Sequence, residues 1–391
     1  MHFQGWIAMR LSLRTVVLSF VLPALVASWG VMTTQAQSAN EIGGQKIVTL
    51  TRKAISTTKP EFTSITVMPG RGMELLQITA NFPGRGNVDV LASPDFAESK
   101  KMLDQDDTAN GDLGYRLGSA FLVPYPNRIR GKLSADGKTL TTEWHGHTIT
   151  LPANNIGKNP GAERHAMHGL ILKAHTDDVA EKAIPGGKEV TGVIHAGNFG
   201  GHWLSKTDLD FTISITADAV DAIVVAKNVG NEAEPIAIGW HPYFNFPSGD
   251  RTQARLQVPA SMLATVDNYD NVFPTGKLVP VTGQYDLRNG QALGKNFYDD
   301  NWSHLDWKNG VVTVNITDPA AKYGVRIEGL SPEIKTIQAY APPNKNFVAV
   351  EDQFNFADPF SKIWGSMDTG MVTLKPGQST KWHVRLKVFV P

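Results

Sequence analysis

The feature that most constrains this chain is a long succession of short segments in which apolar and polar residues alternate. Clear examples are residues 46–51, 73–81, 208–215, 222–226, 311–316 and 382–388. A period of two with many β-branched side chains is typical of strands that bury one face. The 36 glycines and 23 prolines supply turns, and only residues 93–103 suggest a short helix. We therefore expect an all-β fold, a large antiparallel β-sandwich with few short helices.

The first 39 residues differ from the rest of the chain. Arg10 and Arg14 come before and beside an almost wholly apolar run of 12 residues at 16–27, and small residues follow it. This pattern is typical of a secretory signal peptide, and the run is too short for a comfortable membrane span. We predict a signal peptide over 1–39, one sandwich domain over 40–391 and secretion, with the bacterial periplasm as the destination. An uncleaved membrane anchor is the alternative.

The composition narrows the classes of partner. With 37 basic and 37 acidic side chains the formal net charge is zero, which gives no attraction toward nucleic acid or an anionic membrane surface. The absence of cysteine excludes disulfides, thiolate metal sites and cysteine nucleophiles. We expect a neutral or weakly charged small molecule as the ligand, no membrane contact after signal cleavage and no obligatory protein partner.

Two segments combine groups that could transfer protons. His241 lies in an aromatic stretch with Trp240 and Tyr243, and aromatic faces are common walls for the apolar side of a sugar ring. Glu351 follows the apolar run 347–350, so we expect it to be partly buried, with a pKa raised toward that of a useful general base. A structural histidine and an ordinary surface carboxylate are the alternatives.

A third cluster combines Asn127 and Arg128 with His168, about forty residues later. An arginine here either forms an ion pair or binds hydroxyl groups. His165 and His168 at a spacing of three could instead bind a metal, although no carboxylate is clearly spaced to complete the site. His145 and His147 would share one face of a strand, where a solvated edge is the simpler interpretation.

These clusters resemble the sequence elements of the aldose 1-epimerase family, also called galactose mutarotases. The His-Pro-Tyr-Phe-Asn segment at 241–245 matches the most specific family signature. The order of the elements and their spacing follow the family over residues 45–390. The remaining matches are the Asn-Arg-Ile element at 126–129, the first His-Gly element at 167–170, the Pro-Thr-Gly turn and strand at 273–281, the sugar-binding aspartate near 298–302 and the catalytic glutamate at Glu351.

The resemblance implies a mutarotase-like supersandwich and an isomerase that interconverts the α and β anomers of a free aldohexose of the glucose or galactose class. It implies Glu351 as the base and His241 as the acid, and ring opening by these two groups needs no metal and no other cofactor. The resemblance also places His168 with the catalytic residues, where it would hold the sugar ring. The residues expected to bind the sugar are Arg128, Asn127, Asp299 or its neighbour Asp300, and Trp240 as a stacking surface, and the Asn-Trp pair that follows favours Asp299.

Two departures from the family bear on the site, and three rival functions follow from the same residues. The aspartate element has two adjacent candidates, Asp299 and Asp300. Asp352 stands where the family often has proline, and a second carboxylate could raise the pKa of Glu351 further. Neighbours on a strand point to opposite faces, so this pair does not suit a glycosidase. A hexose-phosphate epimerase would need a basic cluster such as Arg128, Arg130 and Lys132. The third rival is a non-catalytic carbohydrate-binding sandwich.

Overall fold

The computed structural model describes residues 40–391, so the predicted signal peptide lies outside the described residues. Strands dominate, and the single α-helix of this part of the chain is α1 (Phe96–Asp104), which confirms the all-β prediction. The helix begins three residues later than predicted because Asp95 caps it, its carboxylate accepting a hydrogen bond from the amide of Glu98. No helix within residues 40–391 is long and apolar enough to cross a membrane.

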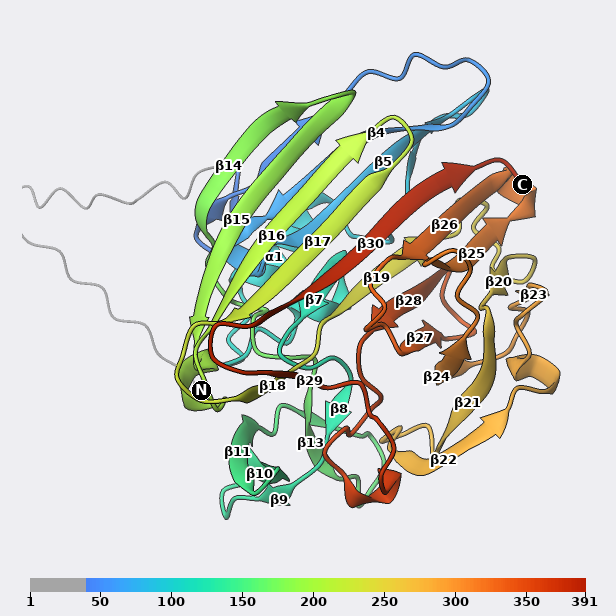
Figure 1. Cartoon of the computed structure of the whole chain (residues 1–391). Coiled ribbons are helices and arrows are strands. Elements are labelled where there is room, and N and C mark those ends of the chain that lie inside the picture. The colour runs from blue at the N-terminus through green and yellow to red at the C-terminus, as the bar shows by residue number, and fades with distance from the viewer. Residues whose placement is uncertain (1–39) are drawn as a thin grey trace, which may run out of the picture. The chain divides into compact units, whose positions relative to one another are not determined.

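Two large antiparallel sheets make up most of the fold (Figure 1). The first has nine strands in the order β14 (Asp177–Ile184), β15 (Gly187–Gly197), β16 (Thr207–Thr216), β17 (Val220–Asn228), β30 (Ser379–Phe389), β26 (Tyr323–Gly329), β25 (Val312–Asp318), β20 (Arg255–Gln257) and β23 (Gln291–Ala292). The second runs in the order β22 (Pro274–Pro280), β21 (Ala260–Val266), β24 (Tyr298–Leu305), β27 (Thr336–Ala341), β28 (Phe347–Gln353), β19 (Gly239–Asn245), β7 (Ser119–Leu122), β5 (Glu74–Phe82), β4 (Glu61–Met68) and β3 (Val48–Thr51), with β6 (Gly86–Asp89) also on β5.

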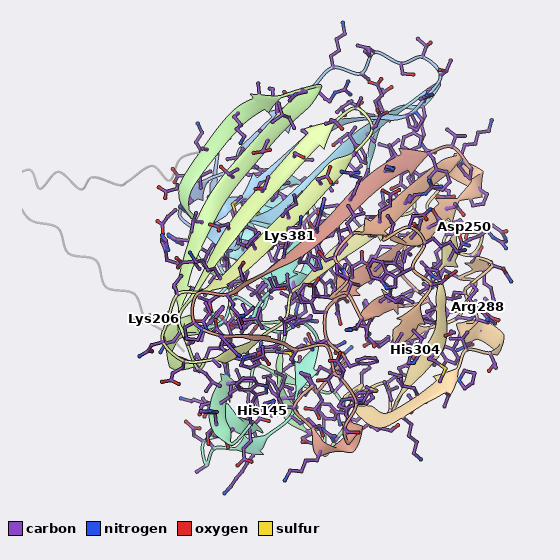
Figure 2. All side chains as sticks on the ribbon, in the orientation of Figure 1. His145, Lys206, Asp250, Arg288, His304 and Lys381 are labelled. Carbon is purple, nitrogen blue, oxygen red and sulfur yellow. The ribbon has the colours of Figure 1, made fainter. Side chains whose placement is uncertain are left out.

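The main hydrophobic core lies between these two sheets. Phe121 of β7 packs against Phe211 of β16, with ring centroids 5.3 Å apart, and Trp240 of β19 packs against Trp382 of β30 at 6.1 Å. Side chains crowd the space between the ribbons (Figure 2). Alternate residues of each strand point away from this core, as the period of two predicts. The outward face of the second sheet is therefore available for a site.

Short strands complete the fold. They are β1 (Glu41–Ile42) with β2 (Gln45–Lys46), β9 (Lys132–Leu133) with β10 (Thr139–Trp144) and β11 (His147–Pro152), β8 (Arg128–Ile129) with β13 (Arg164–Met167) and β12 (Asn155–Ile156), and β18 (Glu234–Ile236) with β29 (Val372–Leu374). The pairing of β8 with β13 brings Met167 opposite Arg128, so Arg128 and His168 arrive side by side although forty residues separate them.

Candidate active site

The candidate catalytic residues lie in one row across the second sheet. Gln338 of β27 is directly opposite Asn301 of β24 on one side and Glu351 of β28 on the other. On the next strand, β19, Gly239 is paired with Gln353 and Tyr243 with Ala349. Midway between these two pairs, His241 of β19 stands opposite Glu351. Side chains directly opposite in an antiparallel sheet share a face and lie in contact. The sheet register therefore unites residues that are 110 positions apart in the sequence.

His241 and Glu351 form a buried pair. The Nε2 atom of His241 is 3.2 Å from Oε1 of Glu351, and the two residues are 4% and 2% exposed. Gln353, two residues beyond Glu351 on the same face of β28, donates a hydrogen bond of 2.7 Å from its Nε2 to the other carboxylate oxygen. The acid and base predicted from sequence are thus within direct contact of each other.

Burial changes the proton affinity of both members of this pair. Removal from water raises the pKa of Glu351 well above its ordinary value, against the hydrogen bond from Gln353, which lowers it. Removal from water also lowers the pKa of His241 to about 4, and the positive charge of Arg128 adds to this effect. Both shifts favour the uncharged forms, so the pair tends to hold a single proton between its two members.

A closed hydrogen-bonded network lies next to the pair. The Nη2 atom of Arg128 contacts Oδ2 of Asp299 at 3.2 Å, and its Nη1 donates to Oδ1 of Asn127 at 3.0 Å. Asn127 in turn donates to Oε1 of Gln338, whose Nε2 donates to Oδ1 of Asp299 at 2.8 Å. These four side chains come from β8 and its preceding loop, β24 and β27. Such a network of fixed donors and acceptors suits the recognition of several hydroxyl groups.

His168 borders the same site. Its ring meets that of His241 edge to face, with centroids 5.0 Å apart, and its Nδ1 atom is buried with no hydrogen-bond partner among residues 40–391. Burial, His241 and Arg128 all lower its pKa well below the ordinary value, so the ring is neutral. The backbone of His168 has a φ of 63°, and Gly169 follows because a Cβ there would lie 2.5 Å from the carbonyl oxygen of Val123.

The structure corrects two of the predicted sugar contacts. Trp240 is 1% exposed, because it alternates with His241 along β19 and points into the core, where its Nε1 donates to the carbonyl of Ser119. It therefore offers no stacking surface at the site. Asp300 faces away from Asp299 for the same reason, and its carboxylate accepts a hydrogen bond of 2.8 Å from the hydroxyl of Tyr269. Asp299 is the aspartate that reaches the network.

The sequence reasoning missed three residues of the site, Gln338, Gln353 and Tyr115, and it named Tyr243 only as an aromatic neighbour of His241. Gln338 joins the network, Gln353 binds Glu351, and Tyr115 and Tyr243 line His241 with ring centroids 6.1 and 4.8 Å away. Tyr243 belongs to the signature segment 241–245 and could have been chosen as the aromatic wall in place of Trp240. A glutamine inside an apolar strand was the available signal for Gln338.

The other histidines considered in the sequence analysis lie outside the candidate site. His165 is fully buried and bonded at both ring nitrogens, to the side chain of Asn155 and the carbonyl of Glu163, so its place is structural. His145 and His147 do not share a strand face, because β10 and β11 turn back between them at His145 and Gly146 (His145 is labelled in Figure 2). Residues 40–391 contain no group of three potential metal ligands.

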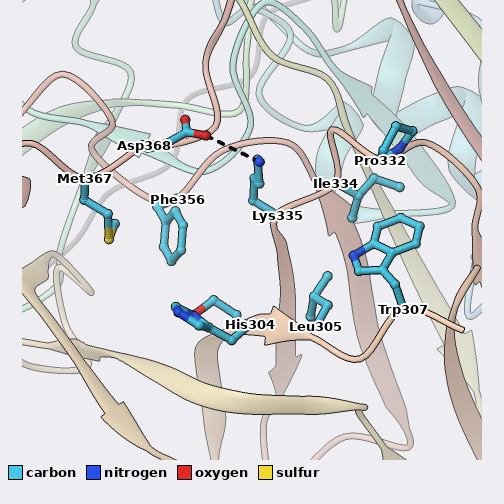
Figure 3. Close-up of a pocket in the computed structure, with 10 residues that line it drawn as sticks. His304, Leu305, Trp307, Pro332, Ile334, Lys335, Phe356, Met367 and Asp368 are labelled. Atoms are coloured by element: carbon cyan, nitrogen blue, oxygen red, sulfur yellow. Dashed lines mark hydrogen bonds and ion pairs between the residues drawn. The ribbon is translucent and has the colours of Figure 1, made fainter. Parts of the chain in front are cut away.

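An open cavity of about 320 Å³ lies elsewhere, bordered by His304, Trp307 and the Lys335–Asp368 ion pair (Figure 3). The two charged groups of that cavity neutralise each other at 3.4 Å. None of the side chains predicted for catalysis or sugar binding lines it. This cavity is therefore separate from the site at His241 and Glu351.

Comparison with known proteins identifies the family of the chain. The profile of the aldose 1-epimerase family matches residues 97–387. None of the curated proteins matches the sequence. Among solved structures, a galactose mutarotase-like protein from Clostridium acetobutylicum is similar, with 20% identity and a TM-score of 0.66 over 88% of this chain and 98% of that one.

Two further structures share the fold. The GalM/aldose epimerase homologue from C. elegans is 16% identical, with a TM-score of 0.62 over 88% of this chain and 99% of that one. The galactose 1-epimerase from Lactobacillus acidophilus is 15% identical, with a TM-score of 0.60 over 88% and 98%. At these identities the likeness shows the fold, whereas the family profile spans most of the chain. The chain belongs to the aldose 1-epimerase family, and it is an isomerase of the mutarotase type.

Proposed function

We propose that the protein interconverts the α and β anomers of a free aldohexose by acid–base ring opening, with Glu351 as the base and His241 as the acid. The observation that carries the proposal is the 3.2 Å separation of His241 Nε2 and Glu351 Oε1 in a buried site. The two oxygens that exchange protons, the anomeric hydroxyl and the ring oxygen, are bonded to one carbon. An acid and a base must therefore lie side by side to reach both.

The proton count of the pair supports this chemistry. Glu351 removes the proton of the anomeric hydroxyl while the imidazolium of His241 delivers one to the ring oxygen, which opens the ring to the aldehyde. Both groups are then neutral, the state that burial favours for each of them. Rotation of the bond to the aldehyde carbon exposes its other face. Closure then reverses both transfers and restores the original charges.

The neighbouring groups suit a neutral sugar. Donors and acceptors in fixed positions come from Arg128, Asp299, Asn127 and Gln338. Neutral His168 adds a ring nitrogen that has no hydrogen-bond partner within residues 40–391. A hexose would lie with its hydroxyls against this network and its apolar face toward an aromatic ring such as Tyr243.

The geometry disfavours the rivals. Arg130, needed for a phosphate site, is already bound to Asp358 at 3.0 Å and covers the ring of Phe273, and Lys132 is exposed on β9. A glycosidase would need a second carboxylate free to act beside Glu351, but Asp352 lies on the core face of β28 and the carboxylate of Asp299 is held by Arg128 and Gln338. A sugar-binding module without catalysis would need no matched acid and base.

The proposal predicts that the protein accelerates the mutarotation of freshly dissolved α-glucose or α-galactose, measured by polarimetry. Replacing Glu351 by Gln keeps the shape but removes the base, so we expect kcat to fall by roughly 10²–10⁴-fold. Asp352→Asn is the matched control, because it alters the adjacent carboxylate on the opposite face and should leave kcat unchanged. Sugar binding without acceleration of any common aldose would reject the enzyme and favour the binding module.

A further inference from the structure

A buried polar side chain beside the candidate active site has no hydrogen-bond partner among the residues that the structure describes. Asn301 lies on β24 two residues from Asp299, and therefore on the same face of the strand. It is 4% exposed, and within residues 40–391 neither its amide oxygen nor its amide nitrogen has a hydrogen-bond partner. Buried amides are almost always paired, so an isolated one beside a binding network points to a ligand.

The amide of Asn301 lines a small, largely enclosed cavity of about 10 Å³. Three members of the sugar-binding network, Asn127, Asp299 and Gln338, form the rest of its polar wall. A cavity of roughly 10–15 Å³ accommodates about one water-sized oxygen. The apolar part of the wall consists of Ala264, Val266, Val272, Pro274, Ala357 and Trp364.

The hydrogen-bonding groups that line the cavity indicate which kind of molecule could fill it. Asn127, Gln338 and Asp299 are joined to one another and to Arg128, whereas Asn301, directly opposite Gln338, stays outside the network. Its amide offers an acceptor oxygen and a donor nitrogen, and a hydroxyl group can both donate to the first and accept from the second. The carboxylate of Asp299 and the apolar wall disfavour an anion, and a cation would leave the amide nitrogen without an acceptor.

The position of Asn301 relates this cavity to the substrate. Asn301, Gln338 and Glu351 are directly opposite one another on three consecutive strands, which places Asn301 about 10 Å from Glu351 at the usual strand spacing. A hexose with its anomeric carbon at Glu351 would lie over Gln338, with its far hydroxyls toward Asn301.

We propose that Asn301 is a specificity-determining residue, which binds in this cavity one hydroxyl oxygen at the end of the sugar remote from the anomeric carbon. A water molecule that bridges Asn301 to the sugar would present the same chemistry, and the experiment separates these two sources. The inference rests on the proposed function, since it assigns the orientation of the sugar in that site.

The test compares Asn301→Leu, which keeps the size but removes the amide, with the wild-type protein in the mutarotation assay. Loss of one neutral hydrogen bond predicts a KM raised by about 3- to 10-fold, with kcat changed less. Ser303→Ala is the matched control, because Ser303 lies on the same face of β24 but does not line the cavity. Asn301→Ala repeats the test if the leucine variant folds poorly.

Deoxy sugars identify the source of the oxygen. If a sugar hydroxyl fills the cavity, the penalty of Asn301→Leu disappears for the 4-deoxy or the 6-deoxy hexose that lacks this group. If a bridging water fills it, the penalty is the same for every sugar. Wild-type kinetics in both Asn301 variants with all sugars would overturn the inference while leaving the proposed function intact.

A crystal structure of the protein with and without glucose provides a readout that needs no activity. The inference expects an oxygen within hydrogen-bond distance of both amide atoms of Asn301, from water in one crystal or from the sugar in the other. An unfilled cavity in both crystals would overturn it. An inactive wild-type protein would instead reject the proposed function, and the crystals would still test Asn301.

Discussion

At the scale of single residues, the proposed reaction depends on one proton shared by two groups. His241 and Glu351 lie in contact, and burial pushes their pKa values in opposite directions. Neither shift would be useful alone, since a neutral imidazole is a poor acid and a protonated carboxyl is no base. Because the two groups interact, they titrate as a pair in two steps. Between these steps, over a wide range of pH, the pair carries one proton.

This arrangement predicts a broad bell-shaped dependence of kcat/KM on pH. Activity falls at low pH only when the pair gains a second proton, near the pKa of about 4 to which burial lowers His241. It falls at high pH only when the pair loses its single proton, above the ordinary range of a glutamate because burial raises the pKa of Glu351. Polarimetry across the pH range, corrected for the uncatalysed reaction, measures both limbs.

A variant of Gln353 tests the alkaline limb separately. The hydrogen bond from Gln353 favours the ionised form of Glu351 and lowers its pKa. Gln353→Met removes the donor at similar size, so the alkaline limb should move to higher pH while the acidic limb stays. A single limb near the ordinary histidine value of about 6.5 would contradict the shared proton.

At the scale of elements, alternate residues of strand β19 face the candidate site and the hydrophobic core. His241 points to the site, and Trp240 packs against Phe121 and Trp382 in the core. Trp240→Ala should therefore lower the free energy of unfolding by about 3–5 kcal/mol, as is usual for a large buried side chain. The KM of the folded protein should stay unchanged. A raised KM with no loss in denaturant unfolding would restore the stacking role.

The same alternation explains how far the sequence could predict this structure. Strands such as β16 and β30 were predictable because one face is buried and the period of two shows it. His241 was recognisable from a long signature. The choice between Asp299 and Asp300 was not, because it depends on which face of β24 carries the site, and the partner strands decide that. Gln338 was missed because its strand is buried on both faces.

At the scale of the whole molecule, a net charge of zero conceals a group of buried ionisable side chains. Among residues 40–391 burial raises the pKa of seven carboxyl groups. The pKa is raised to about 7 in Glu234 and Asp352, to about 6 in Asp300, well above the ordinary value in Glu74 and Glu351, and above the ordinary value in Asp112 and Asp358. Burial also lowers the pKa of three histidines, His165, His168 and His241. Each of these residues makes folding depend on pH, and the two groups act in opposite directions.

The directions of these pKa shifts predict how the free energy of unfolding depends on pH. A buried histidine of lowered pKa costs stability only below about pH 6.5, where the unfolded chain would bind its proton. A carboxyl group whose pKa is raised by folding stabilises the protein fully at a pH below the pKa of the unfolded state. This stabilisation is lost as the pH rises to the pKa of the folded state. The opposing effects partly cancel in mild acid. Above about pH 6.5 the effect of the buried histidines has ended, whereas the carboxyl effect continues up to the folded pKa, about 7 in Glu234 and Asp352. The free energy of unfolding should therefore fall as the pH rises to that value.

Asp352 isolates one part of this effect. Its carboxylate oxygens are buried in the core with no hydrogen-bond partner among residues 40–391, and burial raises its pKa to about 7. Between about pH 5 and about pH 8 the wild-type protein should therefore lose about 3 kcal/mol more than Asp352→Asn, which keeps the shape and cannot ionise. Denaturant unfolding at both pH values measures the difference. Parallel losses in the two proteins would mean that Asp352 is already ionised in the folded state, with a counter-charge or water that reaches it through the core.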